Sequence, residues 1–162
     1  MKYLLMAGVL LLWGCSTAQI ETKDRISELD IYWTEVSRCV GEGDFEGYKD
    51  TIHDEGILVY EPGEKAYPLA KALIRWKKEF DDTKSGKMKA GVSFRFSQRL
   101  GDETTAFETG MFRYFQIKSD GTERVEYIHL EALLVKKPDG WKIVMENQKA
   151  KGTKAEWDKL KK

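Results

Sequence analysis

Apolar residues recur every three or four positions along three stretches of the chain, the spacing that places them on one face of a helix. In the first stretch this face is made by Ile26, Leu29, Trp33, Val36 and Val40. Gly41 and Gly43 end the predicted helix, and Asp44 is suited to cap a second, short one. The second helix would carry Phe45, Tyr48 and Ile52 on one side.

Pro68 suits the first turn of a third helix, which ends near Asp82. Its apolar face is made by Leu69, Leu73, Trp76 and Phe80.

Strict alternation of apolar and polar residues replaces the helical spacing in the second half of the chain. Val92, Phe94 and Phe96 alternate with polar residues, which is typical of a strand with one apolar face. Turn residues interrupt the pattern at 101–102, 119–121 and 138–140, so four strands should follow one another in a meander. A short strand over 57–60 precedes the third helix. Helices followed by antiparallel strands predict an α+β domain.

The beginning of the chain has the layout of a secretory signal: a positive start, an apolar run up to Trp13 and then small residues. The run is shorter than the roughly 20 residues that a transmembrane helix needs, so we expect cleavage and export. Residues 1–14 would be the signal peptide, 15–25 a tether, 26–150 one domain and 151–162 a polar tail.

The end of the signal, Leu12-Trp13-Gly14-Cys15, resembles the bacterial lipobox, although Trp13 stands where a small residue is usual. We therefore expect a lipid on Cys15, which would hold the protein at a membrane of the bacterial cell envelope. Cleavage after Ala18, which would leave a soluble periplasmic protein, is the alternative.

The charged residues disfavour several classes of partner. Lysine and arginine together number 27, as do aspartate and glutamate, and the two signs are interspersed, so nucleic acid is not expected. His53 and His129 have no further ligands at close spacing, so no metal site is expected. Motifs for nucleotides or nucleophilic catalysis are absent, and no cofactor is implied. Cys39 would be the one cysteine left after acylation, and its helical context favours a buried apolar role.

The order of the elements and several short motifs resemble a known family. Gly43-Asp44-Phe45-Glu46 follows the first helix, His53-Asp54-Glu55-Gly56 leads into the short strand, and Asp139-Gly140-Trp141-Lys142-Ile143-Val144 forms the last hairpin. This combination resembles the SnoaL-like branch of the nuclear-transport-factor-2-like superfamily over about residues 25–150. The resemblance implies a cone made by a curved antiparallel sheet wrapped around three N-terminal helices, often with an apolar cavity at its wide end.

Members of this superfamily include isomerases, dehydratases, polyketide cyclases, binding domains and dimerisation modules, so the fold alone does not determine the function. Ketosteroid isomerases among them use a general base, a tyrosine and a protonated acid. By the resemblance, Val36 stands in the place of the tyrosine, Tyr60 beside Glu61 in that of the base, and Glu131 in that of the acid. Since valine cannot donate a hydrogen bond, an identical mechanism is not expected.

His129 and Glu131 share one face of a predicted strand with Tyr127, because side chains two positions apart point the same way. If this face looks into the cavity, His129 and Glu131 are candidate catalytic groups. The alternative is a cross-strand pair with Arg113 or Lys142 on the exposed or dimer-facing side.

Further candidates lie near the expected cavity. Glu61 precedes a proline in a turn that borders the cavity mouth in the family, and it is a third candidate catalytic residue. Tyr60, Trp76 and Tyr127 are candidate ligand contacts, with a plain core role as the alternative. His53, beside Asp54 at the end of the second helix, is expected to have a cap or surface role.

Two functions fit the residues that occupy these expected positions. The favoured one is a domain that binds a small, mostly apolar molecule or a protein partner. The alternative is a cofactor-independent isomerase, dehydratase or cyclase in which Glu131 or Glu61 moves a proton. The resemblance and the open sheet face also lead us to expect a homodimer.

Overall fold

The computed structural model describes residues 15–160 and confirms the expected α+β class. The expected signal peptide, residues 1–14, lies outside the described part. In chain order the elements are α1 (Cys15–Glu42), α2 (Phe45–Asp50), β1 (Ile52–Tyr60), a 3-10 turn η1 (Glu61–Gly63), β2 (Lys65–Pro68), α3 (Leu69–Lys84), β3 (Met88–Gly101), β4 (Thr105–Lys118), β5 (Glu123–Lys137), β6 (Gly140–Lys151) and α4 (Lys154–Lys159).

All six strands form one sheet in the order β2-β1-β6-β5-β4-β3. Strands β3 to β6 make the expected antiparallel meander, with hairpins at the three predicted turns. The expectation of an entirely antiparallel sheet is wrong, because β1 pairs with β6 in parallel, with Leu58 opposite Glu146. The chain leaves β1 through β2 and α3 and returns only after three further strands, so that β6 runs in the same direction as β1.

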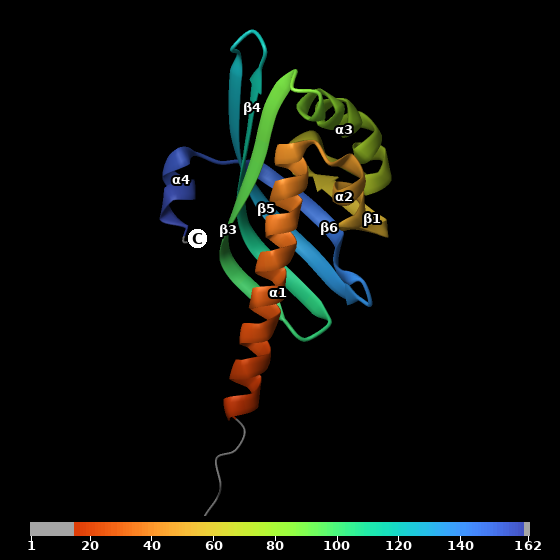
Figure 1. Ribbon diagram of the computed structural model, residues 1–162. Coiled ribbons are helices and arrows are strands. Elements are labelled where there is room, and N and C mark those ends of the chain that lie inside the picture. The colour runs from red at the N-terminus through yellow and green to blue at the C-terminus, as the bar shows by residue number, and fades with distance from the viewer. Residues whose placement is uncertain (1–14, 161–162) are drawn as a thin grey trace, which may run out of the picture.

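Three helices lie against one face of this sheet (Figure 1). Helix α1 crosses the sheet, and α2 and α3 cover the end near β1. The core lies between these layers and includes several side chains with almost no exposed surface, namely Leu29, Leu58, Leu69, Leu130 and Leu134. We call the sheet face that carries this core the inner face.

The first helix is longer than predicted. It begins at Cys15, so residues 15–25, which were expected to form a tether, are helical. No glycine or proline interrupts this stretch, so nothing in its backbone chemistry ends the helix before the domain. Arg25 is buried and donates from Nη2 to the carbonyl oxygen of Arg99 at 3.3 Å, which ties this part of α1 to β3.

The second helix is shorter than predicted, and β1 is longer. Helix α2 ends at Asp50, and β1 begins at Ile52, which lies opposite Ile143 of β6. His53 therefore lies in a strand and not at a helix end. Pairing with β6 supplies backbone partners that outweigh the helical spacing of Ile52.

The C-terminal tail also contains a helix, α4, which packs on the outer face of the sheet (Figure 1). Thr153 and Glu156 form a capping box at its start, and Trp157 is only 6% exposed. The Trp157 ring lies 6.0 Å from that of Tyr127 and 4.5 Å from the guanidinium of Arg95. Helix α4 therefore covers part of the face that was expected to be open. Within residues 15–160, no helix combines the length and the apolarity needed to cross a membrane.

Candidate functional site

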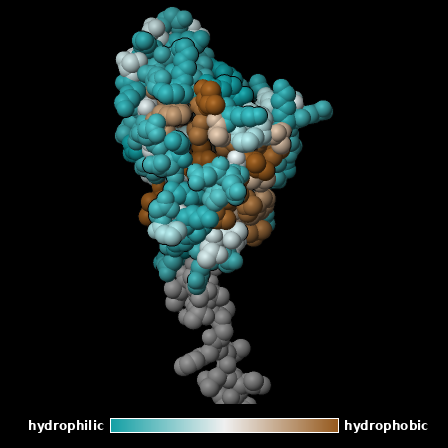
Figure 2. Space-filling view, turned by 90° about the vertical axis from the view of Figure 1, so that its right-hand side faces the viewer, coloured by the Kyte–Doolittle hydropathy of each residue, from teal (hydrophilic) through white to brown (hydrophobic). Residues whose placement is uncertain are grey.

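A cavity of about 480 Å³ lies between the inner face of the sheet and the three covering helices. Its size is in the range of small-molecule sites. Aromatic side chains make much of its wall: Tyr32, Trp33, Tyr48, Trp76, Phe94 and Phe112. Figure 2 shows apolar surface gathered in a depression among hydrophilic residues on the side where α3 and β1 lie. Shape and lining thus suit a small, largely apolar molecule.

One carboxyl group, that of Glu146 on β6, borders the interior of this cavity. Glu146 keeps some exposed surface, but desolvation by the protein around it raises its pKa above its ordinary value. Gln148 donates from Nε2 to Glu146 Oε1 at 2.6 Å, which opposes the shift less strongly. The raised pKa widens the pH range in which this carboxyl is neutral, and a neutral carboxyl can donate a hydrogen bond to a ligand.

A β-bulge turns Glu146 inward. Leu134 lies opposite Ile143 while its neighbour Leu133 lies opposite Met145, so one extra residue, Val144, is inserted in β6. The bulge changes which residues of β6 face inward. Before it, Trp141 and Ile143 point to the inner face. After it, Glu146 and Gln148 point to that face.

Two tyrosines line the same region of the cavity. The hydroxyl of Tyr32 donates to the backbone oxygen of Thr51 at 3.2 Å, which fixes its orientation. Burial raises the pKa of both Tyr32 and Tyr48, and the nearby carboxyl of Glu146 adds to this shift in each. Both phenols therefore keep their protons, and Tyr48 is a potential hydrogen-bond donor near Glu146.

Charged side chains occur toward the solvent side of the cavity, a region that we call the mouth: Arg75, Glu79, Arg124, Glu126 and Lys151. Tyr114 donates its hydroxyl to Glu79 Oε2 at 3.1 Å, which joins β4 to α3 across the mouth. A polar mouth over an apolar interior is the arrangement that orients a bound molecule.

No protein-family model matches the sequence, and no curated protein matches it in sequence. Solved structures do match. The structure of an NTF2-like protein with a cystatin-like fold from Novosphingobium aromaticivorans superposes with a TM-score of 0.64 at 16% identity, over 86% of this chain and 91% of that one. The chain has a nuclear-transport-factor-2-like (NTF2-like) fold. A conserved protein from Planctomyces limnophilus gives a TM-score of 0.66 at 11% identity, over 81% and 99% of the two chains. ActVI-ORFA from Streptomyces coelicolor gives 0.59 at 14%, over 76% and 95%.

Two of the candidate residues lie in the cavity of this NTF2-like fold. Tyr60, at the end of β1, and Trp76, on α3, both line it. Trp76 also packs against Tyr48, with ring centroids 6.2 Å apart, so it has a core role as well as a place in the wall.

Three other candidates, Tyr127, His129 and Glu131, lie on the outer face. On β5 the residues that point inward are the even-numbered ones, such as Ile128 and Leu130, which line the cavity. The expectation that the face of Tyr127, His129 and Glu131 looks into a cavity is therefore wrong. Both faces of β5 carry large apolar residues, so the alternation alone could not identify the inner one.

The polar candidates on the outer face have partners there. Lys149 Nζ lies 2.7 Å from Glu131 Oε1, and this contact lowers the pKa of Glu131. Asn147 donates from Nδ2 to Glu131 Oε2 at 3.2 Å and to Glu61 Oε1 at 2.9 Å. His129 Nε2 lies 3.5 Å from Glu156 Oε1 of α4. The cross-strand alternative thus describes Glu131, with Lys149 as partner in place of Arg113 or Lys142.

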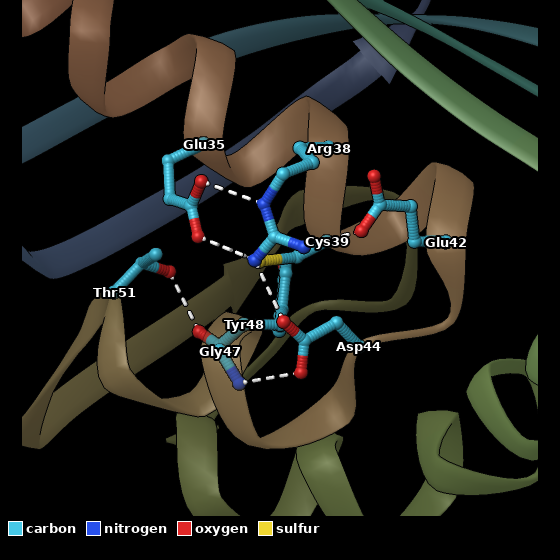
Figure 3. Close-up of polar contacts among 8 residues, drawn as sticks. All are labelled: Glu35, Arg38, Cys39, Glu42, Asp44, Gly47, Tyr48 and Thr51. Atoms are coloured by element: carbon cyan, nitrogen blue, oxygen red, sulfur yellow. Dashed lines mark hydrogen bonds and ion pairs between the residues drawn. The ribbon is translucent and has the colours of Figure 1, made fainter.

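The buried thiol of Cys39 lies in a second polar cluster, between α1 and the start of α2 (Figure 3). Glu35, Cys39 and Asp44 approach one another as metal ligands do, but Arg38 occupies the space between them. Its Nη2 lies 2.6 Å from both Glu35 Oε1 and Asp44 Oδ2. Burial, followed by the hydrogen bond to Glu35, raises the pKa of Cys39 to about 12. This cluster fixes α1 against the start of α2, and its thiol stays protonated.

Proposed function

We propose that the protein binds a small, largely apolar molecule in the cavity between α1, α2, α3 and the sheet. The observation that carries the proposal is the aromatic wall around about 480 Å³ of space, with the carboxyl of Glu146 in its lining. Apolar walls contribute affinity, and a few placed polar groups orient a ligand. We further assign the chain to the SnoaL-like branch, with the sheet curving as a cone around the cavity.

Native mass spectrometry of the purified protein tests this function. We expect a co-purified small molecule, or failing that, micromolar binding of the uncharged apolar fluorophore N-phenyl-1-naphthylamine. Val92→Trp, which adds a large side chain to the cavity wall, should weaken binding at least tenfold. Glu131→Ala, on the outer face, is the matched control and should bind as the wild type does. An empty protein that also fails to bind the fluorophore would contradict the proposal.

A second function is favoured by the raised pKa of the Glu146 carboxyl and by the phenol of Tyr48 in the same cavity lining. A carboxyl with a raised pKa is a candidate general acid or base at neutral pH. The alternative function is therefore a cofactor-independent isomerase, dehydratase or cyclase, with Glu146 in the role that the sequence suggested for Glu131 or Glu61. It requires the raised pKa of Glu146.

We also propose that the mature protein is attached to the bacterial cell envelope by a lipid on Cys15. Labelled palmitate should then be incorporated by the wild-type protein and not by Cys15→Ala, because acylation needs the thiol. Cys39→Ala is the control and should be labelled normally. Equal labelling of Cys15→Ala and wild type would contradict lipid attachment at Cys15 and favour cleavage after Ala18.

A homodimer formed through the outer face remains part of the proposal. Helix α4 covers the region around Tyr127 and Arg95, so two copies would meet on the part of that face which α4 leaves open.

A further inference from the structure

Arg75 is a cation at the mouth of the cavity with no acidic partner of its own. Its guanidinium lies 5.8 Å from the centroid of the Tyr67 ring and 5.9 Å from that of Trp76, so it is held over the aromatic edge of the cavity. Asp81, an acid of the same helix, is engaged by Lys77 at 2.8 Å. Among residues 23–160, no carboxylate lies within ion-pair distance of Arg75.

The opposite side of the mouth also has more cationic than anionic groups. Glu126 is shared by two cations: Arg124 Nη2 lies 2.8 Å from Glu126 Oε2, and Lys151 Nζ lies 3.4 Å from Oε1. The carboxylate of Glu79 accepts the hydroxyl of Tyr114. The mouth thus carries three cations, Arg75, Arg124 and Lys151, against the two carboxylates of Glu79 and Glu126.

The interior behind the mouth adds little negative charge. Glu146 is its carboxyl group, and desolvation raises the pKa of this group. The rest of the wall is dominated by aromatic and aliphatic groups. A molecule with an apolar body and one negative charge would therefore meet an attractive mouth and a mostly apolar interior.

We propose that the cavity takes an apolar organic monoanion, with its anionic group at Arg75 and its apolar body against the aromatic wall. This inference rests on the proposed function and narrows its ligand to organic acids that fit about 480 Å³. An arginine suits this role because its planar guanidinium can donate two parallel hydrogen bonds to a carboxylate or sulfonate.

Two fluorophores that differ by a single sulfonate group provide the test: 1-anilinonaphthalene-8-sulfonate and its uncharged counterpart N-phenyl-1-naphthylamine. Arg75→Gln should weaken binding of the sulfonate about tenfold, which corresponds to about 1.4 kcal/mol. The same change should leave the Kd of the uncharged probe within about twofold. Lys71→Gln removes one positive charge from the same helix outside the cavity lining, and it should change neither Kd by more than about twofold.

The possible outcomes separate this inference from the proposed function. If Arg75→Gln weakens both probes equally, or neither, the anionic site is wrong while an apolar cavity still stands. If the wild type carries no co-purified molecule and binds neither probe, both proposals fail. Val92→Trp must weaken both probes, since binding that it leaves unchanged lies outside the cavity and overturns the inference. Far-ultraviolet circular dichroism of each variant shows that the fold is retained.

Discussion

Replacing Glu108 with alanine is expected to lower the free energy of unfolding by about 3–5 kcal/mol. Glu108 is 0% exposed, and its carboxylate accepts hydrogen bonds from Trp33 Nε1 and from Arg99 Nε. Without it, a buried indole N–H and a largely buried guanidinium lose their acceptor, although Arg99 keeps Asp30 at 2.5 Å. Urea unfolding followed by circular dichroism measures the loss.

The same network positions part of the cavity. Trp33 lines the cavity wall and is held by Glu108, so the variant should also bind an apolar probe more weakly. Glu103→Ala, in an exposed position five residues earlier on the chain, is the control and should change stability by less than about 0.5 kcal/mol. A loss below about 1 kcal/mol for Glu108→Ala would show that this network contributes little net stability.

Replacing Glu146 with glutamine is expected to stabilise the protein at neutral pH relative to the wild type. The pKa of Glu146 is raised in the folded state, so its neutral form stabilises the fold fully only at pH values below the ordinary pKa. As pH rises, the unfolded chain ionises first, and the wild type loses about 1.4 kcal/mol for each unit by which the pKa is raised. The loss stops once pH passes the folded pKa. Glutamine resembles the neutral acid and does not ionise, so the stability of the variant does not fall in this way as pH rises.

Urea unfolding of wild type and Glu146→Gln between pH 4 and pH 8 measures the effect, which should grow with pH. Glu131→Gln is a control of opposite sign. Its pKa is lowered by Lys149, so its charge stabilises the fold above the ordinary pKa, and its loss should destabilise the protein at neutral pH and not at low pH. Parallel curves for wild type and Glu146→Gln would mean that Glu146 titrates ordinarily, and the acid–base function would then fail.

Much of the fold could be predicted because its signals are local. The apolar spacing of Leu29, Trp33 and Val36 identified the face of α1 that is buried, and turn residues placed the three hairpins. Helix α4 was missed although its signal is also local: Thr153 and Glu156 have the spacing of a capping box, and Trp157 follows at once. Residues that act through contacts close in sequence can be interpreted from one sequence.

The candidate site was only partly predictable because it depends on choices that are not local. Tyr60 and Trp76 were found, but the inner face of β5 is decided by which side α1 packs against. Glu146 was not among the candidates, because strict alternation from Trp141 through Ile143 and Met145 would point its side chain outward. A single inserted residue, Val144, reverses that assignment, and no glycine or other unusual residue marks it.

The parallel pairing of β1 with β6 has a consequence for the order in which the molecule can fold. Leu58 finds its partner Glu146 only after the whole meander has been made, so the sheet closes through a contact between distant parts of the chain. Such contacts slow folding, since a long loop must be ordered before any pairing compensates for its lost entropy. The hairpins of β3 to β6 can form beforehand. The strand that carries Tyr60, and with it one wall of the cavity, is therefore expected to join last, so the ability to bind a ligand would appear only at the final step of folding.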